Sequence, residues 1–270
     1  MLSKIWAFIK RDALQAVSYK MGFVGQFFGI FFGVATFFFI SKVVGTGAAQ
    51  YLTKYRGDYF AFAIVGMAFN SFLGVGLSSL AGIIRREQLQ GTLEAMLVTR
   101  TPLSLIIFSS ALWNFGFTSF RVLVYVLTGY FLFGMNLNFS LEGLLAGLLI
   151  LLVTLLSFMG IGMISASFIL IFKEGNPLDF LMGASSGLLG GVFYPIAVLP
   201  LWLQPFSKIL PITYGIEGFR KALLVRATFQ DILPELSVLT IFLVILLPLG
   251  LISFSYAVKY AKKEGTLVHY

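Results

Sequence analysis

The sequence predicts an all-α integral membrane protein that forms one transmembrane domain over residues 1–270. Of its residues, 59% are hydrophobic and only 11% are charged, whereas a soluble domain carries about 25% charged residues. Several apolar stretches reach the roughly 20 residues that a helix needs to cross the bilayer. The alternating segments of about 10 residues that build a membrane barrel are missing. Because lipid offers no hydrogen bonds to the backbone, the apolar stretches are expected to be helices.

Six stretches have the length and the apolar character of transmembrane helices. They cover residues 23–44, 59–84, 104–133, 143–171, 179–199 and 236–258.

Residues 1–20 predict an amphipathic helix that lies in the membrane interface. One helical face carries apolar side chains, with Trp6 at head-group depth, and the opposite face carries Lys4, Arg11, Gln15 and Ser18. The members of the apolar face are Leu2, Ile5, Trp6, Ile9, Ala13, Ala16 and Val17. Such a helix serves either as a simple anchor or as an anchor that also touches a cytoplasmic partner.

The first span carries Gly25, Gly29 and Gly33 at four-residue spacing. Small residues at this spacing let another helix approach closely. That helix belongs either to the same chain or to a partner subunit, and packing within the chain is the more common arrangement.

Residues 85–102 form a charged island between two apolar blocks and therefore lie in water at the membrane surface. Connections between helices need about 2–8 residues, but this segment has eighteen, begins with Arg85-Arg86 and ends at Pro102. Its mixture of acids, bases and leucines favours a short helix over a simple positively charged loop.

The distribution of Lys and Arg favours an orientation with both termini in the cytoplasm. In that orientation the cytoplasmic segments hold 11 of the 19 basic residues, and the outer segments hold seven. An excess of basic residues marks the cytoplasmic side of a membrane protein. The net charge of +8 accordingly indicates attraction to anionic lipid head groups and not to nucleic acid.

Residues 193–226 are too apolar for water and too interrupted for a continuous span. Prolines recur every five or six residues at Pro195, Pro200, Pro205 and Pro211, and proline breaks a helix interior. The segment therefore predicts a re-entrant pair of short helices between the fifth and sixth spans, packed against protein or a wet cavity.

Two of these segments resemble the ABC-2 family of ATP-binding-cassette permeases. The first is E-x-x-x-G-T-L-E from Glu87 to Glu94, and the second is F-Y-P…L-P…P-I-T-Y…E-G-F-R-K-A-L from Phe193 to Leu223. The layout along nearly the whole chain is also similar to that of these type V exporters. The resemblance implies an export permease that works as a dimer, as a homodimer or with a paralogue, on two separate ATPase subunits that bind ATP and Mg²⁺.

The resemblance also implies site residues in both segments. The cytoplasmic segment is expected to form a coupling helix that docks on the ATPase through Glu87, Gly91, Thr92, Leu93 and Glu94. Translocation and the re-entrant fold are expected to involve Arg121, Tyr194, Pro195, Pro211, Tyr214, Glu217 and Arg220.

Arg121 is the one charge well inside a predicted span. A charge there costs at least about 2.5–3.5 kcal/mol on insertion scales, so the side chain is expected to face protein or a wet cavity. Glu217 and Glu142 are the candidate partners. A packing role and a substrate-facing role are both open.

The predicted function is export of an amphiphilic substrate, such as a drug, lipid or glycolipid, across the cytoplasmic membrane. Tyr19-Lys20 is followed by Met21-Gly22 and phenylalanines, without the Trp typical of polysaccharide exporters, so the chain looks more like the drug- and antibiotic-resistance branch. Export of a lipid-linked polysaccharide is the alternative. A secondary transporter is a further alternative, but it would need acidic residues at mid-span and inverted repeats.

Other chemistry finds little support in the sequence. The phosphate-binding pattern G-x-x-x-x-G-K-[ST] does not occur, so no ATPase site and no enzymatic activity of the chain itself are expected. Gly183 to Gly187 matches the nucleophile elbow G-x-S-x-G, but the only histidine is His269. Metal ligands are too few for a site, there is no cysteine, and no cofactor is expected on this chain.

Overall fold

Helices make up most of the structure, a computed structural model that describes residues 2–55, 57–89, 91, 103–138, 140–172 and 177–263. No strand occurs in these ranges, which confirms the all-α prediction. The long helices are α1 (Leu2–Ser18), α2 (Lys20–Ala49), α3 (Tyr59–Leu89), α5 (Leu103–Phe133), α6 (Leu141–Phe172) and α10 (Phe229–Lys263). The shorter ones are η1 (Thr53–Tyr55), α7 (Pro177–Leu189), η2 (Ile196–Val198), α8 (Gln204–Ile209) and α9 (Pro211–Leu224).

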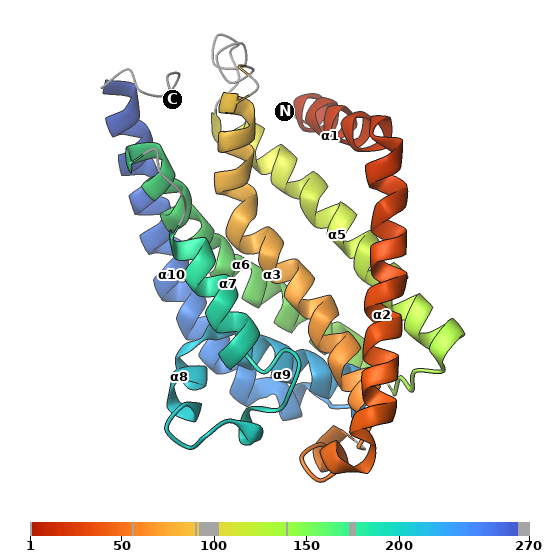
Figure 1. The fold of residues 1–270 in the computed structure, drawn as a ribbon. Coiled ribbons are helices and arrows are strands. Elements are labelled where there is room, and N and C mark those ends of the chain that lie inside the picture. The colour runs from red at the N-terminus through yellow and green to blue at the C-terminus, as the bar shows by residue number, and fades with distance from the viewer. Residues whose placement is uncertain are drawn as a thin grey trace.

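The long helices form a bundle whose two ends differ (Figure 1). One end holds α1, the end of α3, the start of α5 and the end of α10. The opposite end holds η1, α8 and α9. Helix α9 packs mainly against α6, α10 and α3, so this short helix covers the end of the bundle opposite α1.

Five helices in the described part of the chain are long and apolar enough to cross a membrane. They are Lys20–Val44, Tyr59–Leu77, Ser109–Phe133, Leu141–Phe172 and Phe229–Ala261, and they coincide with five of the six predicted spans.

The predicted span over 179–199 is wrong as a continuous helix. Helix α7 ends at Leu189 after 13 residues, and 13 residues extend only about 20 Å, which is short of the roughly 30 Å of hydrocarbon. The physical reason is the pair Gly190-Gly191. Gly191 has a φ of 71°, a left-handed conformation that glycine adopts without strain and that ends helices.

Helix α1 occupies most of the segment predicted to be amphipathic, and a polar contact fixes it to α5. Asp12 is buried and pairs with Arg11 at 2.7 Å. Arg11 also donates a hydrogen bond of 3.5 Å from Nη2 to the hydroxyl of Ser110 on α5. Trp6 lies on the exposed side of the helix, so the predicted apolar face is divided between the bundle and the surroundings.

Glycines allow the closest helix contacts, and of the three glycines predicted to do so only Gly33 meets another helix within the described residues, with Met67 of α3 3.6 Å from a Cβ built there. A Cβ on Gly160 of α6 would lie 2.4 Å from the carbonyl of Leu246, and one on Gly250 of α10 would lie 2.4 Å from the carbonyl of Gly160. Nothing lies within 4 Å of such an atom at Gly25 or Gly29. The structure therefore contradicts the expectation that these two glycines pack against another helix of the chain. Among the described residues, no other part of the chain lies against that face of α2.

Candidate functional site

The end of the bundle opposite α1 contains a buried cation, Arg220 of α9, whose side chain is 2% exposed. Its Nε and Nη2 donate hydrogen bonds to the carbonyl of Phe62 on α3, at 3.2 and 3.1 Å. Nη1 donates to the carbonyl of Gly191 at 2.7 Å, and Nη2 donates to that of Val192 at 2.6 Å. One guanidinium thus ties together α9, the start of α3 and the bend after α7.

The acceptors of Arg220 are main-chain carbonyls, and two of them lie just beyond the end of α7. Carbonyls at this position have no partner within a helix and carry the negative end of the helix dipole. A planar guanidinium with five donors suits several carbonyls at once.

The guanidinium also stacks on the ring of Phe62, with Cζ 3.4 Å from the ring centroid, which adds a cation–π attraction. Burial lowers the pKa of Arg220 to about 9, so the group stays charged at neutral pH.

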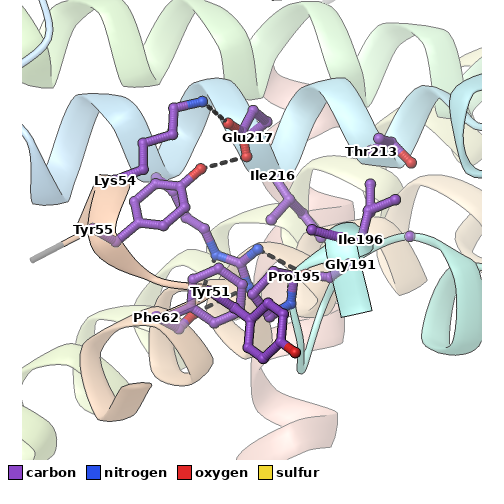
Figure 2. Close-up of a pocket in the computed structure, with 13 residues that line it drawn as sticks. Tyr51, Lys54, Tyr55, Phe62, Gly191, Pro195, Ile196, Thr213, Ile216 and Glu217 are labelled. Atoms are coloured by element: carbon purple, nitrogen blue, oxygen red, sulfur yellow. Dashed lines mark hydrogen bonds and ion pairs between the residues drawn. The ribbon is translucent and has the colours of Figure 1, made fainter. Parts of the chain in front are cut away.

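Glu217 lies one turn before Arg220 on α9 and faces η1. Its carboxylate accepts hydrogen bonds from the ammonium of Lys54 and from the phenol of Tyr55, as Figure 2 shows. Burial raises the pKa of the carboxyl, but the hydrogen bonds from Lys54 and Tyr55 outweigh it, so the pKa of Glu217 is lowered overall. Burial and the neighbouring carboxylate raise the pKa of Tyr55, which keeps the phenol protonated as a donor. We call Lys54, Tyr55, Phe62, Glu217 and Arg220 the polar cluster.

Glycine is required next to the polar cluster because backbones approach closely there. A Cβ on Gly66 of α3 would lie 2.1 Å from the carbonyl of Val192 and 2.4 Å from Nη2 of Arg220. On α9, a Cβ at Gly215 would meet the ring of Phe69 at 2.6 Å. The chain can therefore bring the bend, α3 and α9 together only because these positions lack side chains.

The polar cluster forms one wall of a cavity of about 290 Å³. The lining residues include Tyr51, Lys54, Tyr55, Glu217 and Arg220 on the polar side and Pro195, Ile196 and Ile216 on the apolar side. Two cations face one carboxylate in this wall, so the cavity is suited to a small polar or anionic group. No group of His, Cys, Asp or Glu side chains able to hold a metal ion occurs in the described ranges.

The remaining residues predicted for the re-entrant segment support its local structure. Pro195 precedes η2 and lines the cavity, and Pro211 begins α9. The phenol of Tyr194 donates to the carbonyl of Leu188, and that of Tyr214 donates to the carbonyl of Lys208 at 3.0 Å. These contacts fold the short helices against each other.

Arg121 does not pair with Glu217 or Glu142, and this prediction was wrong. Lys54 and Tyr55 occupy the carboxylate of Glu217, and Glu142 accepts from the backbone N–H of Phe229 at 3.1 Å. The buried Nε of Arg121 has no hydrogen-bond partner among the described residues. Helix α5 therefore places Arg121 apart from the polar cluster. The sequence alone did not show that Arg121 and Glu217 are not in contact.

The sequence analysis missed Lys54, Tyr55, Phe62 and Gly66. A usable signal was the short polar run Lys54 to Asp58 at the end of the bundle that also holds Glu217.

The predicted coupling residues lie only partly within the described residues. Glu87 lies in α3, Gly91 turns with a φ of 66°, and Thr92, Leu93 and Glu94 fall outside the described residues.

A family model described as "ABC-2 type transporter" matches residues 3–224. The chain belongs to the ABC-2 type transporter family. The match runs from α1 to the end of α9, so it includes the whole polar cluster of this ABC-2 permease. A comparison with curated proteins finds no match.

The close approach at Gly66 predicts a large effect of a single methyl group. We expect Gly66→Ala to lower the thermal stability of the purified ABC-2 permease, because its Cβ would overlap Val192 and Arg220. Overpacking of this kind costs about 1–3 kcal/mol. Gly74→Ala on the same helix is the control. It has open space around it and should be neutral or gain up to about 1 kcal/mol from helix propensity. Equal stability of the two variants would contradict the close approach.

The polar cluster predicts that Arg220 cannot be replaced by an apolar side chain. Arg220→Met removes the donor shared by three buried carbonyls, and we expect a loss on the order of 3 kcal/mol because unsatisfied buried groups cost about 1–3 kcal/mol each. Arg220→Lys should recover only part of the loss, since an ammonium lacks the planar fork. Thermal unfolding in detergent measures both. Lys208→Met, an exposed lysine at the same end, should stay within about 0.5 kcal/mol of wild type.

Proposed function

We propose that this chain is the membrane subunit of an ABC exporter that moves an amphiphilic substrate out across the cytoplasmic membrane, driven by separate ATPase subunits. The observation that carries the proposal is the family match over residues 3–224, in a sequence that contains no phosphate-binding P-loop. In this proposal the nucleotide site belongs to separate ATPase subunits. Mg²⁺ and ATP accordingly belong to the partner.

The proposed orientation places the end of the bundle with α1 in the cytoplasm. Helix α1, the end of α3 and the end of α10 lie together there (Figure 1), next to most of the basic residues of the connecting segments. Basic residues favour the cytoplasmic side. The polar cluster and its cavity then face the outer side, where a substrate leaves.

The proposed coupling element is the segment that contains Glu87, Gly91, Thr92, Leu93 and Glu94. It begins at the cytoplasmic end of α3 in this orientation. Glu87 and Glu94 would form charge-assisted hydrogen bonds with the ATPase, and Leu93 would be buried in the contact. A movement of the ATPase would then reach α3 directly, and the Phe62 carbonyl of α3 is held by Arg220 of α9 at the opposite end.

The proposed dimer uses the open face of α2. Phe28, Phe32 and Phe39 on this helix are 60%, 63% and 64% exposed, and Gly25 and Gly29 have open space above them. A row of small residues between exposed aromatic side chains suits close packing against a second permease protomer.

The orientation is tested by labelling introduced cysteines, since the chain has none of its own. We expect Thr53→Cys, exposed at the η1 end, to react with a membrane-impermeant maleimide in intact cells. Lys263→Cys, exposed at the end of α10, should react only after the membrane is permeabilised. Labelling of Lys263→Cys and not of Thr53→Cys in intact cells would reverse the orientation.

The coupling proposal is tested by co-expression with an ABC ATPase subunit that co-purifies with the wild-type permease. We expect Glu87→Lys/Glu94→Lys to abolish co-purification of the ATPase and transport, because two lysines would replace the acids that contact it. The amount and thermal stability of the permease should not change. Gln230→Lys, which adds a lysine at the opposite end, is the control and should retain the ATPase. Normal co-purification and transport by the double variant would refute the assignment of this segment.

A further inference from the structure

A second and larger cavity of about 810 Å³ opens between α5 and α6. Both helices pack on α3. We call this cavity the lateral groove. The groove is lined by side chains of α3, α5, α6 and α9 and of the connections that follow α5 and α9. They are Phe72, Phe115, Ser119, Val122, Leu123, Val126, Leu127, Tyr130, Phe131, Leu137, Asn138, Leu144, Leu148, Leu151, Phe219, Leu223 and Arg226.

The lateral groove is apolar along its length and open to the surroundings of the bundle. Leu123, Leu127 and Leu148 are 53%, 42% and 52% exposed, although they lie within helices long enough to span a membrane. The groove follows α5 from Phe115 to Tyr130, and these 16 residues extend over about 22 Å of helix. One leaflet of hydrocarbon is about half of the 30 Å core. The groove is therefore long enough to take the acyl chain of a lipid from one leaflet.

The end of the lateral groove near α9 is polar and positively charged. The buried Nδ2 of Asn138 has no hydrogen-bond partner among the residues that the structure describes, and a buried amide donor without a partner is costly unless a ligand or water supplies an acceptor. Arg226 lines the same groove, is exposed and forms no ion pair within the described residues. The two residues are joined by the backbone N–H of Arg226, which donates to the carbonyl of Asn138 at 3.1 Å.

The backbone at Arg226 is strained, which shows that its position is set by the surrounding structure. Its φ of 55° makes it the one residue other than glycine with a positive φ in the described ranges. Such a conformation costs an arginine about 1–2 kcal/mol. Strain of this kind persists where the surrounding structure fixes it and is concentrated at ligand sites. Glu142 and Asp231, the nearby acids, accept hydrogen bonds from the backbone of Phe229 and Thr228, and within the described residues neither forms an ion pair with Arg226.

We propose that the lateral groove binds an anionic phospholipid, with an acyl chain between α5 and α6 and the phosphate on Arg226 and Asn138. A guanidinium binds a phosphate through paired charge-assisted hydrogen bonds, and the free Nδ2–H of Asn138 supplies one more donor. The charge of Arg226 selects an anionic lipid over a zwitterionic one. The lipid fills the gap that would otherwise leave α5 and α6 apart. This site is separate from the polar cluster, and its occupation does not depend on the proposed export activity.

The test compares lipid binding to the delipidated permease by native mass spectrometry. Phosphatidylglycerol and phosphatidylcholine with the same acyl chains are titrated in parallel. We expect the wild type to prefer phosphatidylglycerol, because the choline cation of phosphatidylcholine repels Arg226 and offsets the charge of the phosphate. Arg226→Gln should weaken phosphatidylglycerol binding about tenfold, the loss of roughly one charge-assisted hydrogen bond, and should weaken phosphatidylcholine binding less. Leu148→Trp and Leu127→Trp, which fill the groove from its two walls, should weaken the binding of both lipids.

Two matched variants control for non-specific effects. Lys208→Gln removes an exposed charge at the same end but outside the groove, and Leu152→Trp enlarges an exposed leucine of α6 outside the groove. Both should bind lipid as the wild type does. Equal affinity for the two lipids in the wild type, or unchanged phosphatidylglycerol binding in Arg226→Gln and both tryptophan variants, would overturn the proposal. So would loss of the dimer in the tryptophan variants with lipid binding intact, since the groove would then be a protein interface.

Discussion

Arg220 lies where α9, the start of α3 and the bend after α7 meet, and its guanidinium has almost no access to water. Every donor must therefore find a partner inside the protein, and the carbonyls of Phe62, Gly191 and Val192 supply the acceptors. Losing the cation would leave the carbonyls of Gly191 and Val192, which lie outside any helix, unsatisfied, so the three elements depend on one side chain. The rest of this end of the bundle is arranged around that requirement.

The absence of side chains at a few glycines allows the elements to come close enough. Gly66 lets the carbonyl of Val192 and the guanidinium of Arg220 reach α3, and Gly191 gives the bend its left-handed backbone. The same device joins α6 to α10 at Gly160 and Gly250. In a bilayer, where burial of apolar surface between helices gains little, close packing of small residues and satisfied polar contacts are the terms that hold helices together. This fold uses both.

The polar cluster and the lateral groove lie at the same end of the molecule and share α9. Arg220 and Glu217 of α9 face the cluster, while Phe219 and Leu223 of the same helix face the groove. A change in the position of α9 would therefore alter both sites together. The groove separates α5 from α6, so an occupant that supports these two helices would also support the helix that carries the cluster.

Composition and hydropathy alone determined that this chain is a helical membrane protein, and two short motifs carried its resemblance to the ABC-2 family. The apolar stretches have to be helices in lipid, and five of them appear close to the predicted positions. The motif from Phe193 to Leu223 also contains Glu217 and Arg220, which both belong to the polar cluster. These features are local, since hydrophobicity and short-range spacing can be read from neighbouring residues.

Only the tertiary structure decided which charges meet and which helices pack closely. Glu217 lies 163 positions from Lys54. The polar run from Lys54 to Asp58 is a signal for this end of the bundle, but no local pattern says that it meets Glu217, so Arg121 was predicted as the partner instead. The fifth span was predicted too long because hydropathy does not register the left-handed turn at Gly191. Gly25 and Gly29 had the right spacing for helix packing but lie on the open face of α2, because which face of a helix turns inward depends on the whole bundle.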